Sequence, residues 1–238
     1  MKSHNRAPQC GVFSSFSEMK QSAVRQPYEA VEVIEAAPTR RAQSKLRTRH
    51  KVLDAARALF IERGYEAATV RDIARRAGMS TGAVFANFQD KSDLFDAVVV
   101  DDYERVAELM REAANAHANA DVATRLTEIL SAGYGYYAES LPLVQATVAQ
   151  SWLRPLNAEL AGRAAFKVLL GVIGDALRDA SRKTEVRQDF DVRLASEMLW
   201  DAYLSNFRKA LFDSWSQPAL RRRIGDQVEL VLEGLRVR

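Results

Sequence analysis

The stretch TVRDIARRAGMSTGAVFANFQDK, residues 69–91, decides the fold at one end of this chain. Its first half has apolar residues at the i, i+3, i+4, i+7 spacing of a helix with one buried face: Val70, Ile73, Ala74 and Ala77. Thr69 stands directly before this face, where its hydroxyl can cap the first turn. Gly78 follows it, at the position where a left-handed residue ends a helix at least cost. A short amphipathic helix ending at a glycine turn is therefore predicted.

A second short helix is predicted after Ser80, which is again placed as an N-cap, and Val84, Phe85 and Phe88 are predicted to form its buried side. A helix, a glycine turn and a helix at this spacing form a helix-turn-helix, whose second helix can enter the major groove of DNA. The outward residues are small or polar and would allow close approach: Ser80, Thr81, Gly82, Ala83 and Asn87. An ordinary helical hairpin joined at a glycine is the alternative.

Residues 77–95, AGMSTGAVFANFQDKSDLF, resemble the recognition segment of the TetR family of bacterial repressors. The resemblance covers roughly residues 45–95 and is carried by Gly78, Met79, Ser80, Gly82, Phe85, Phe88 and Lys91. It implies a three-helix DNA-binding unit followed by a helical domain that binds a ligand and dimerises. The family usually has tyrosine where Phe85 stands, and often histidine and tyrosine at Ala86 and Asn87. Phe85 can pack against a sugar but cannot donate a hydroxyl to a phosphate, so the contact that a tyrosine hydroxyl would make is not expected at Phe85.

The charge distribution favours the same end of the chain. Residues 40–95 hold twelve Lys and Arg against six Asp and Glu, whereas residues 96–238 hold eighteen against twenty-one. A local excess of positive charge is what binding to DNA phosphates requires. The alternative interpretation of these residues is an ordinary charged helix face in contact with solvent. Lys91, beside a fourth helix that Asp90 or Ser92 would cap, is placed for a phosphate. The residues expected to contact DNA are Arg49, Thr69, Ser80, Thr81, Gly82, Ala83, Phe85, Asn87 and Lys91.

Composition and length favour an all-α protein. The chain has 238 residues, of which 47% are hydrophobic, and strand-type alternation is nearly absent. We see no secretion signal and no apolar run of about twenty residues, so a cytoplasmic protein without a membrane partner is expected. The single cysteine, Cys10, excludes an internal disulfide and makes a structural zinc site unfavourable.

Three regions are predicted: a mostly disordered extension with a basic arm (1–43), the helix-turn-helix unit (44–95), and a helical ligand-binding and dimerisation domain (96–238). The basic run over residues 39–51 could follow DNA phosphates or be an untethered linker, with equal weight. The first helix is expected from Ser44 to Arg63, where Gly64 stops it. Its buried residues are predicted to be Val52, Ala55, Ala56, Leu59 and Phe60. The fourth helix should continue toward Asn115, carrying Leu94, Phe95, Val98 and Val99.

Five more helices are predicted, near 121–139, 143–153, 157–181, 190–214 and 218–236, with breaks at Pro142, Pro155 and Pro218. In the fourth of these, Leu194, Met198 and either Trp200 or Tyr203 are expected to face inward. The last two helices resemble the pair through which TetR proteins form homodimers. The apolar residues of 194–215 exceed what one buried helix face needs. A two-fold dimer would place two recognition helices about 34–36 Å apart on a near-palindromic operator.

Several aromatic residues of the third region could line a pocket for a small apolar or aromatic effector, although plain core is the alternative: Tyr134, Tyr137, Trp152, Phe166, Trp200 and Tyr203. His4, His50 and His117 stand apart from any nucleophile or second ligand, so no enzyme, cofactor or metal site is expected. The sequence therefore predicts a homodimeric repressor that an effector releases from operator DNA. A ligand-independent DNA-bound interaction protein and a transcriptional activator on the same fold remain alternatives.

Overall fold

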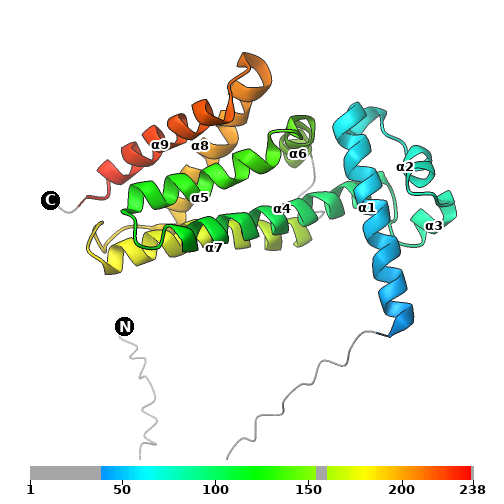
Figure 1. Ribbon diagram of the computed structural model, residues 1–238, viewed down its shortest axis with the longest axis horizontal. Helices are drawn as coiled ribbons and strands as arrows, with labels where there is room; N and C mark the ends of the chain where they lie inside the picture. The colour runs from blue at the N-terminus through cyan, green and yellow to red at the C-terminus, as the bar shows by residue number, and fades with distance from the viewer. Residues whose placement is uncertain (1–38, 154–159, 237–238) are drawn as a thin grey trace, which may run out of the picture. The chain divides into compact units, whose positions relative to one another are not determined.

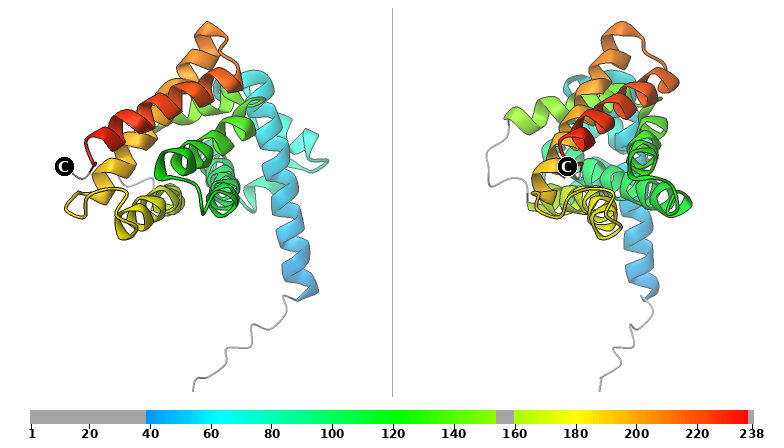
Figure 2. Two further views of the ribbon diagram at one scale, coloured as in Figure 1. Left: turned by 60° about the vertical axis from the view of Figure 1, so that its left-hand side comes forward. Right: turned by 90° about the vertical axis from the view of Figure 1, so that its left-hand side faces the viewer.

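The computed structural model describes residues 39–153 and 160–236, and every regular element within these ranges is a helix (Figures 1 and 2). The all-α class predicted from the sequence is confirmed. In chain order the helices are α1 (Arg40–Ala67), α2 (Val70–Arg76), α3 (Thr81–Phe85), α4 (Lys91–Ala116), α5 (Val122–Tyr137), α6 (Leu141–Leu153), α7 (Leu160–Arg182), α8 (Val192–Asp213) and α9 (Gln217–Glu233).

A first hydrophobic core joins α1, α2, α3 and the beginning of α4. It contains all five residues predicted for the buried face of α1, together with Ile73, Val84, Phe88, Leu94, Phe95 and Val98. Leu143 of α6 also lies in this core. Gly64 interrupts α1 with a φ of 78°, as its predicted role as a helix stop requires, and the helical run then resumes to Ala67. The helix begins at Arg40, four residues before the predicted start.

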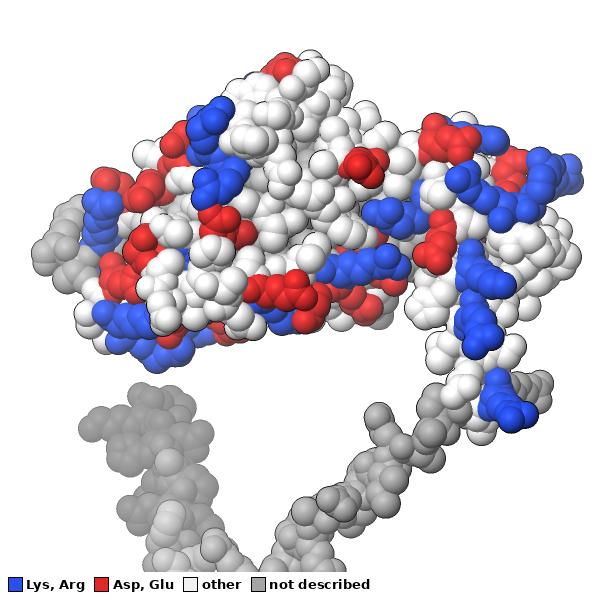
Figure 3. All heavy atoms as spheres, viewed as in Figure 1, with Lys and Arg blue, Asp and Glu red and all other residues white. Residues whose placement is uncertain are grey.

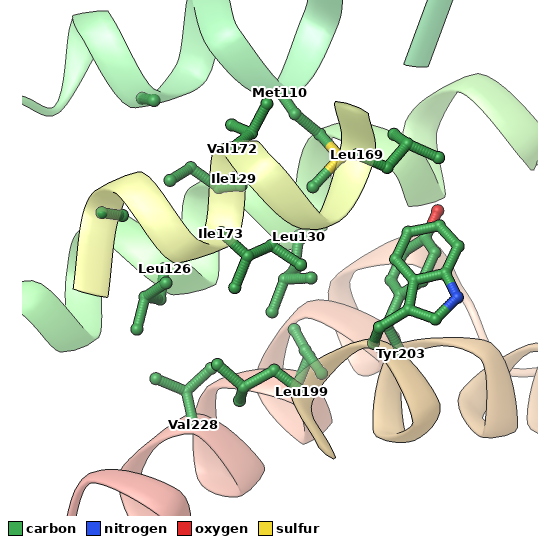
Figure 4. Packing of buried hydrophobic residues seen from close by; sticks show 14 of the residues in the cluster. Met110, Leu126, Ile129, Leu130, Leu169, Val172, Ile173, Leu199, Tyr203 and Val228 are labelled. Atoms are coloured by element: carbon green, nitrogen blue, oxygen red, sulfur yellow. The ribbon is translucent and has the colours of Figure 1, made fainter. Parts of the chain in front are cut away.

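A second core fills the space between α4, α5, α7, α8 and α9 (Figure 4). Met110, Leu126, Leu169 and Leu199 are each at most 1% exposed there. Helix α9 packs along both α5 and α8, as Figures 1 and 2 show. Helix α4 contributes to both cores, with its first turns in one and Val106 to Ala114 in the other. Helix α4 therefore links the two cores, and α6 also contributes to both through Leu143 and Val144.

The orientation of α8 differs from the prediction. Leu194 and Met198 are 55% and 51% exposed, so the expectation that they face inward is wrong. Trp200 and Tyr203 were predicted as alternatives for the inward position, and both are buried. Apolar residues occur on more than one side of α8, and periodicity alone does not select the side that packs. Its buried stripe begins at Ala195, whose small side chain suits the close approach of neighbouring helices.

Two of the three prolines predicted as helix breaks lie at helix starts. Pro142 is in the first turn of α6 and Pro218 in the first turn of α9, where a missing amide hydrogen loses no helical bond. Pro155, Cys10, His4 and residues 1–38 of the predicted extension lie outside the described residues. Within the described ranges, none of the helices is both long and apolar enough to span a bilayer.

Candidate nucleic-acid interface and ligand cavity

Local hydrogen bonds build the turn between α2 and α3. Thr69 Oγ1 accepts from the Asp72 amide at 3.2 Å, and Ser80 Oγ accepts from the Ala83 amide at 3.2 Å. Between these two caps, Gly78 has a φ of 69°, and the Met79 amide donates to the Ala74 carbonyl at 2.9 Å. Both predicted caps and the left-handed glycine are confirmed. The entry and exit of this turn are thus specified by residues within a few positions of it.

The two phenylalanines near α3 lie in opposite environments. Val84 and Phe88 are buried at 1% and 2% exposure, as predicted, but Phe85 is 53% exposed. The prediction that Phe85 is buried is therefore wrong. A helix of five residues has room for one inward side chain, and Val84 occupies that position, while Phe88 follows in the next turn. Thr81 is half-buried, and Ser80, Gly82 and Phe85 are exposed.

Besides Thr69 and Ser80, whose hydroxyls cap α2 and α3, three more of the predicted contact residues have partners within the fold. The Lys91 ammonium donates to the carbonyls of Tyr65 and Glu66 at 3.0 and 3.1 Å. It therefore caps the last turn of α1. The Arg49 guanidinium lies 4.5 Å from the centre of the Phe88 ring. Asn87 Nδ2 donates to the Ala83 carbonyl at 3.0 Å. The last predicted contact, Ala83, is half-buried.

Basic side chains follow α1 and gather over α2, interspersed with acidic ones, while the surface over α3 is mostly uncharged (Figure 3). Arg75 pairs with Asp72 at 3.2 Å, and Arg76 pairs with Glu62 at 2.5 Å. The hydroxyl of Thr69 and the neighbouring arginines lower the pKa of Asp72, so this carboxylate stays charged. The positive charge therefore flanks α3 and is partly balanced by acidic residues.

A cavity of about 980 Å³ lies between α4, α6, α7 and α8. Trp152, Phe166 and Trp200, three of the predicted pocket residues, line it. Tyr137 and Tyr203 line a much smaller cavity of about 50 Å³ that shares several wall residues with the first. Burial raises the pKa of both tyrosines, so their hydroxyls remain neutral.

Tyr134 lines neither cavity. It is 1% exposed, its hydroxyl donates to the Tyr203 carbonyl at 3.2 Å, and the same oxygen accepts from Asn206 Nδ2 at 3.0 Å. Its assignment to the pocket is therefore corrected: Tyr134 is a core residue whose hydroxyl both donates and accepts a hydrogen bond within the core. It lies about half a helical turn from Tyr136 along α5, so the two rings face different neighbours.

The sequence did not point to the remaining walls of the larger cavity. They include Val99 and Tyr103 of α4, Val144 and Val148 of α6, Leu204 and Leu211 of α8, and two basic residues, Arg163 and Arg208. These residues come from four separate helices and have no shared motif. Within the described ranges, acidic residues, histidines and cysteines form no group of three that could hold a metal ion.

Comparisons with known proteins match the helix-turn-helix end most closely. The family model "Bacterial regulatory proteins, tetR family" matches residues 52–98. The repressor AcnR of Corynebacterium diphtheriae is 45% identical over 64 residues, which are 27% of this chain and 34% of that protein. The chain thus spans about a third of the length of this relative.

Longer similarity extends beyond that end. The repressor KstR2 of Rhodococcus jostii is 30% identical over 162 residues, covering 64% of this chain and 74% of that protein. The crystal structure of FadR from Bacillus subtilis in complex with stearoyl-CoA has the same fold, with a TM-score of 0.64, 24% identity, and coverage of 78% of this chain and 98% of that one. With its helix-turn-helix and its similarity to KstR2, this chain belongs to the TetR family of bacterial regulatory proteins.

Proposed function

We propose that this chain is a transcriptional regulator, acting as a repressor, whose helix α3 enters the major groove of operator DNA. The observation that carries the proposal is the contrast between the buried and the exposed side of α3. Val84 and Phe88 are buried in the first core and anchor the helix, while Gly82 and Phe85 are exposed and Thr81 is half-buried. Apart from the Phe85 ring, the outward side chains of α3 are small, and such a helix can approach base edges closely.

The predicted contact residues divide into two groups in this proposal. Ser80, Thr81, Gly82, Ala83 and Phe85 form the surface that faces DNA. The second group would contact DNA while keeping the intramolecular contacts that fix their side chains: Arg49, Thr69, Asn87 and Lys91. Such preorganisation reduces the entropy that a side chain loses on binding.

Selection of duplexes from a random pool, followed by fluorescence anisotropy on the enriched sequence, tests this proposal and finds the operator in the same experiment. Thr81→Ala should weaken binding by about 1 kcal/mol or more if Thr81 contacts a base edge, with little change in melting temperature. Lys91→Met should lower the melting temperature as well, because it removes the cap on α1. The proposal would be contradicted by two results together: the selection enriches no sequence, and the Thr81→Ala variant binds random DNA as tightly as the wild-type protein does.

We further propose that the regulator is a homodimer formed through α8 and α9. The outward faces of these helices and the turn between them carry large exposed apolar side chains: Leu194, Met198, Phe212, Trp215 and Leu230. Met198→Lys should convert the dimer to a monomer in sedimentation velocity, because a charge would be buried at the interface. Val168→Lys, at an exposed apolar residue of α7, is the matched control and should leave the dimer intact.

The proposed effector has an elongated apolar body and an acidic head. The cavity wall is mainly aromatic and aliphatic, and it also contains two basic residues, Arg163 and Arg208, and two acidic ones, Asp96 and Asp201. The acidic head is proposed to lie at Arg208. The related FadR structure contains stearoyl-CoA, a molecule of this shape. Stearoyl-CoA, stearate and a neutral aromatic compound should be compared by quenching of tryptophan fluorescence and by release from the selected duplex.

Arg208→Met should weaken binding of the acidic probes by more than that of the neutral one, since only the former use the positive charge. Equal affinities for all three probes would contradict the acidic head. Unchanged DNA binding with every probe would favour the ligand-independent alternative.

A further inference from the structure

Side chains from three helices meet where two donors, Arg57 and Tyr136, reach the carboxylate of Asp102. Arg57 Nε of α1 donates to Asp102 Oδ1 of α4 at 2.9 Å, and the Tyr136 hydroxyl of α5 donates to the same oxygen at 2.7 Å. The Arg57 guanidinium also lies 5.2 Å from the centre of the Tyr136 ring. We call this group, Arg57, Asp102 and Tyr136, the three-helix junction.

The carboxylate of the junction depends on its two partners. The side chain of Asp102 is 3% exposed and that of Arg57 is 24% exposed. Burial raises the pKa of Asp102, and the hydrogen bonds from Tyr136 and Arg57 oppose this rise. A buried carboxylate that loses one charged or hydroxyl donor keeps the cost of desolvation without the compensation. Asp102 therefore favours the one arrangement of α1, α4 and α5 in which both donors reach it.

The junction lies between the two cores. Beyond the helix-turn-helix, α1 packs against α4 and α6, and the ion pair of Arg57 with Asp102 joins it to α4. Leu143 of α6 lies in the first core, while the next residue, Val144, lines the cavity. The orientation of α1 is thus set at the same few positions that border the cavity.

Cavity residues adjoin the junction on two helices. Tyr103 follows Asp102 on α4 and lines the larger cavity. Tyr137 follows Tyr136 on α5, lines the smaller one, and packs edge-on against Tyr136 with ring centres 5.0 Å apart. A molecule that moves Tyr103 or Tyr137 would therefore act on the partners of Asp102 through directly adjoining residues.

We propose that Asp102 is a positioning residue for DNA binding, which holds α1, and with it α2 and α3, at a defined angle to the cavity-bearing helices through Arg57 and Tyr136. The inference rests on the proposed DNA-binding function, and it names the contact through which a molecule bound in the cavity would change DNA affinity. An ion pair that only stabilises the fold is the competing explanation, and it predicts no effect beyond stability.

The test compares the junction with another partly buried ion pair. Asp102→Asn and Tyr136→Phe each weaken the junction, and the second removes only one hydroxyl. Arg125→Met is the matched control, because Arg125 pairs with Asp179 of α7 at 2.7 Å and donates to the Ala114 carbonyl, near the far end of α4 from Asp102, at 3.2 Å. DNA affinity is measured on the selected duplex, well below the melting temperature of every variant.

The junction variants should change DNA affinity by a factor of about five or more. The Arg125→Met control should lower the melting temperature while leaving DNA affinity at the wild-type value. Wild-type affinity in both junction variants, with lowered melting temperatures, would reduce the junction to a stabilising contact and overturn the inference.

A second readout does not require DNA. In a Cys10→Ser background, spin labels at Arg71→Cys on α2 and Arg178→Cys on α7 report the distance between the helix-turn-helix and the cavity-bearing helices. An excess of unlabelled protein ensures that both labels lie in one protomer. Asp102→Asn should broaden or shift the distance distribution, and Arg125→Met should leave it unchanged. An unchanged distribution in Asp102→Asn would overturn the positioning role, whereas failure to select any duplex would instead count against the proposed function.

Discussion

The two candidate binding regions are built in opposite ways. Around α3 the binding surface is convex, and nearby residues in the chain specify it: caps at Thr69 and Ser80, a left-handed glycine at 78, and anchors at Val84 and Phe88. The cavity is concave, and its walls come from four helices that start as early as residue 91 and end as late as residue 213. A convex surface needs one correctly oriented helix, whereas a cavity needs several helices at correct mutual distances.

This difference has consequences for substitution. Changes around α3 separate cleanly into those that affect the fold and those that affect the surface, because adjacent residues face opposite ways. Changes around the cavity alter packing and binding together, since the same side chains form the core and the wall. Trp200, which is 3% exposed and lines both cavities, has both roles.

The largest expected effect contrasts two phenylalanines that are three positions apart. Phe88→Ala should cost about 3–5 kcal/mol of unfolding free energy, because it removes a buried ring from the first core. Phe85→Ala should change stability far less, since the ring is already 53% exposed, but it should weaken DNA binding. Urea denaturation and anisotropy on the selected duplex measure both. Comparable losses of stability would mean that α3 is rotated about its axis, with Phe85 turned into the core.

The next contrast compares two helical glycines near the cavity helices. A Cβ on Gly133 of α5 would lie 2.9 Å from Cζ of the buried Tyr203, whereas one on Gly171 of α7 would meet nothing within 4 Å. Gly133→Ala should therefore cost about 1–3 kcal/mol through overpacking. Gly171→Ala should stabilise by about 0.5–1 kcal/mol, because alanine loses less backbone entropy in a helix. Thermal denaturation distinguishes them, and a stabilised Gly133→Ala would refute the close packing of the Tyr203 ring against α5.

A smaller effect is expected at the cap of α2. Thr69→Ala should cost about 1 kcal/mol, because the Asp72 amide loses its side-chain acceptor. Thr69→Ser keeps the hydroxyl and is the control. If hydrogen exchange of the Asp72 amide is equally slow in Thr69→Ala, the cap contributes nothing to α2.

The smallest effect concerns pH and the cap of α5. Hydrogen bonds from the backbone amide and the hydroxyl of Thr124 lower the pKa of Asp121. Because the folded-state pKa is depressed, this stabilisation is present above the unfolded value of about 4 and is lost as pH falls through the folded value. Asp121→Asn caps without titrating, so its stability should fall less steeply between about pH 5 and 3. Parallel acid denaturation curves for the two proteins would exclude this contribution.

Much of the helix-turn-helix follows from short-range rules. The caps at Thr69 and Ser80 and the glycine turn were predictable because each needs only a residue type and a spacing of a few positions. Buried faces of long helices were also predictable, as Val52, Leu59 and Phe60 show. The exposure of Phe85 was not, since a five-residue helix does not repeat its pattern often enough to define a face.

Side-chain roles in the second core depended on packing partners. Leu194 and Met198 have the spacing of a buried stripe, yet they are exposed because α7 and α9 contact another side of α8. Tyr134 and Tyr137 are three positions apart on α5, and only Tyr137 borders a cavity. No local pattern distinguishes such residues.

By itself, the sequence determined the helical class, the ends of the helices near α3 and the resemblance to a regulator family, because hydrophobic periodicity, capping and turn geometry act between neighbouring residues. The tertiary structure alone decided which face of α8 is buried, where the cavity lies, and that Arg57, Asp102 and Tyr136 meet. These features depend on the distances between helices, which arise only when the whole chain packs its side chains at once.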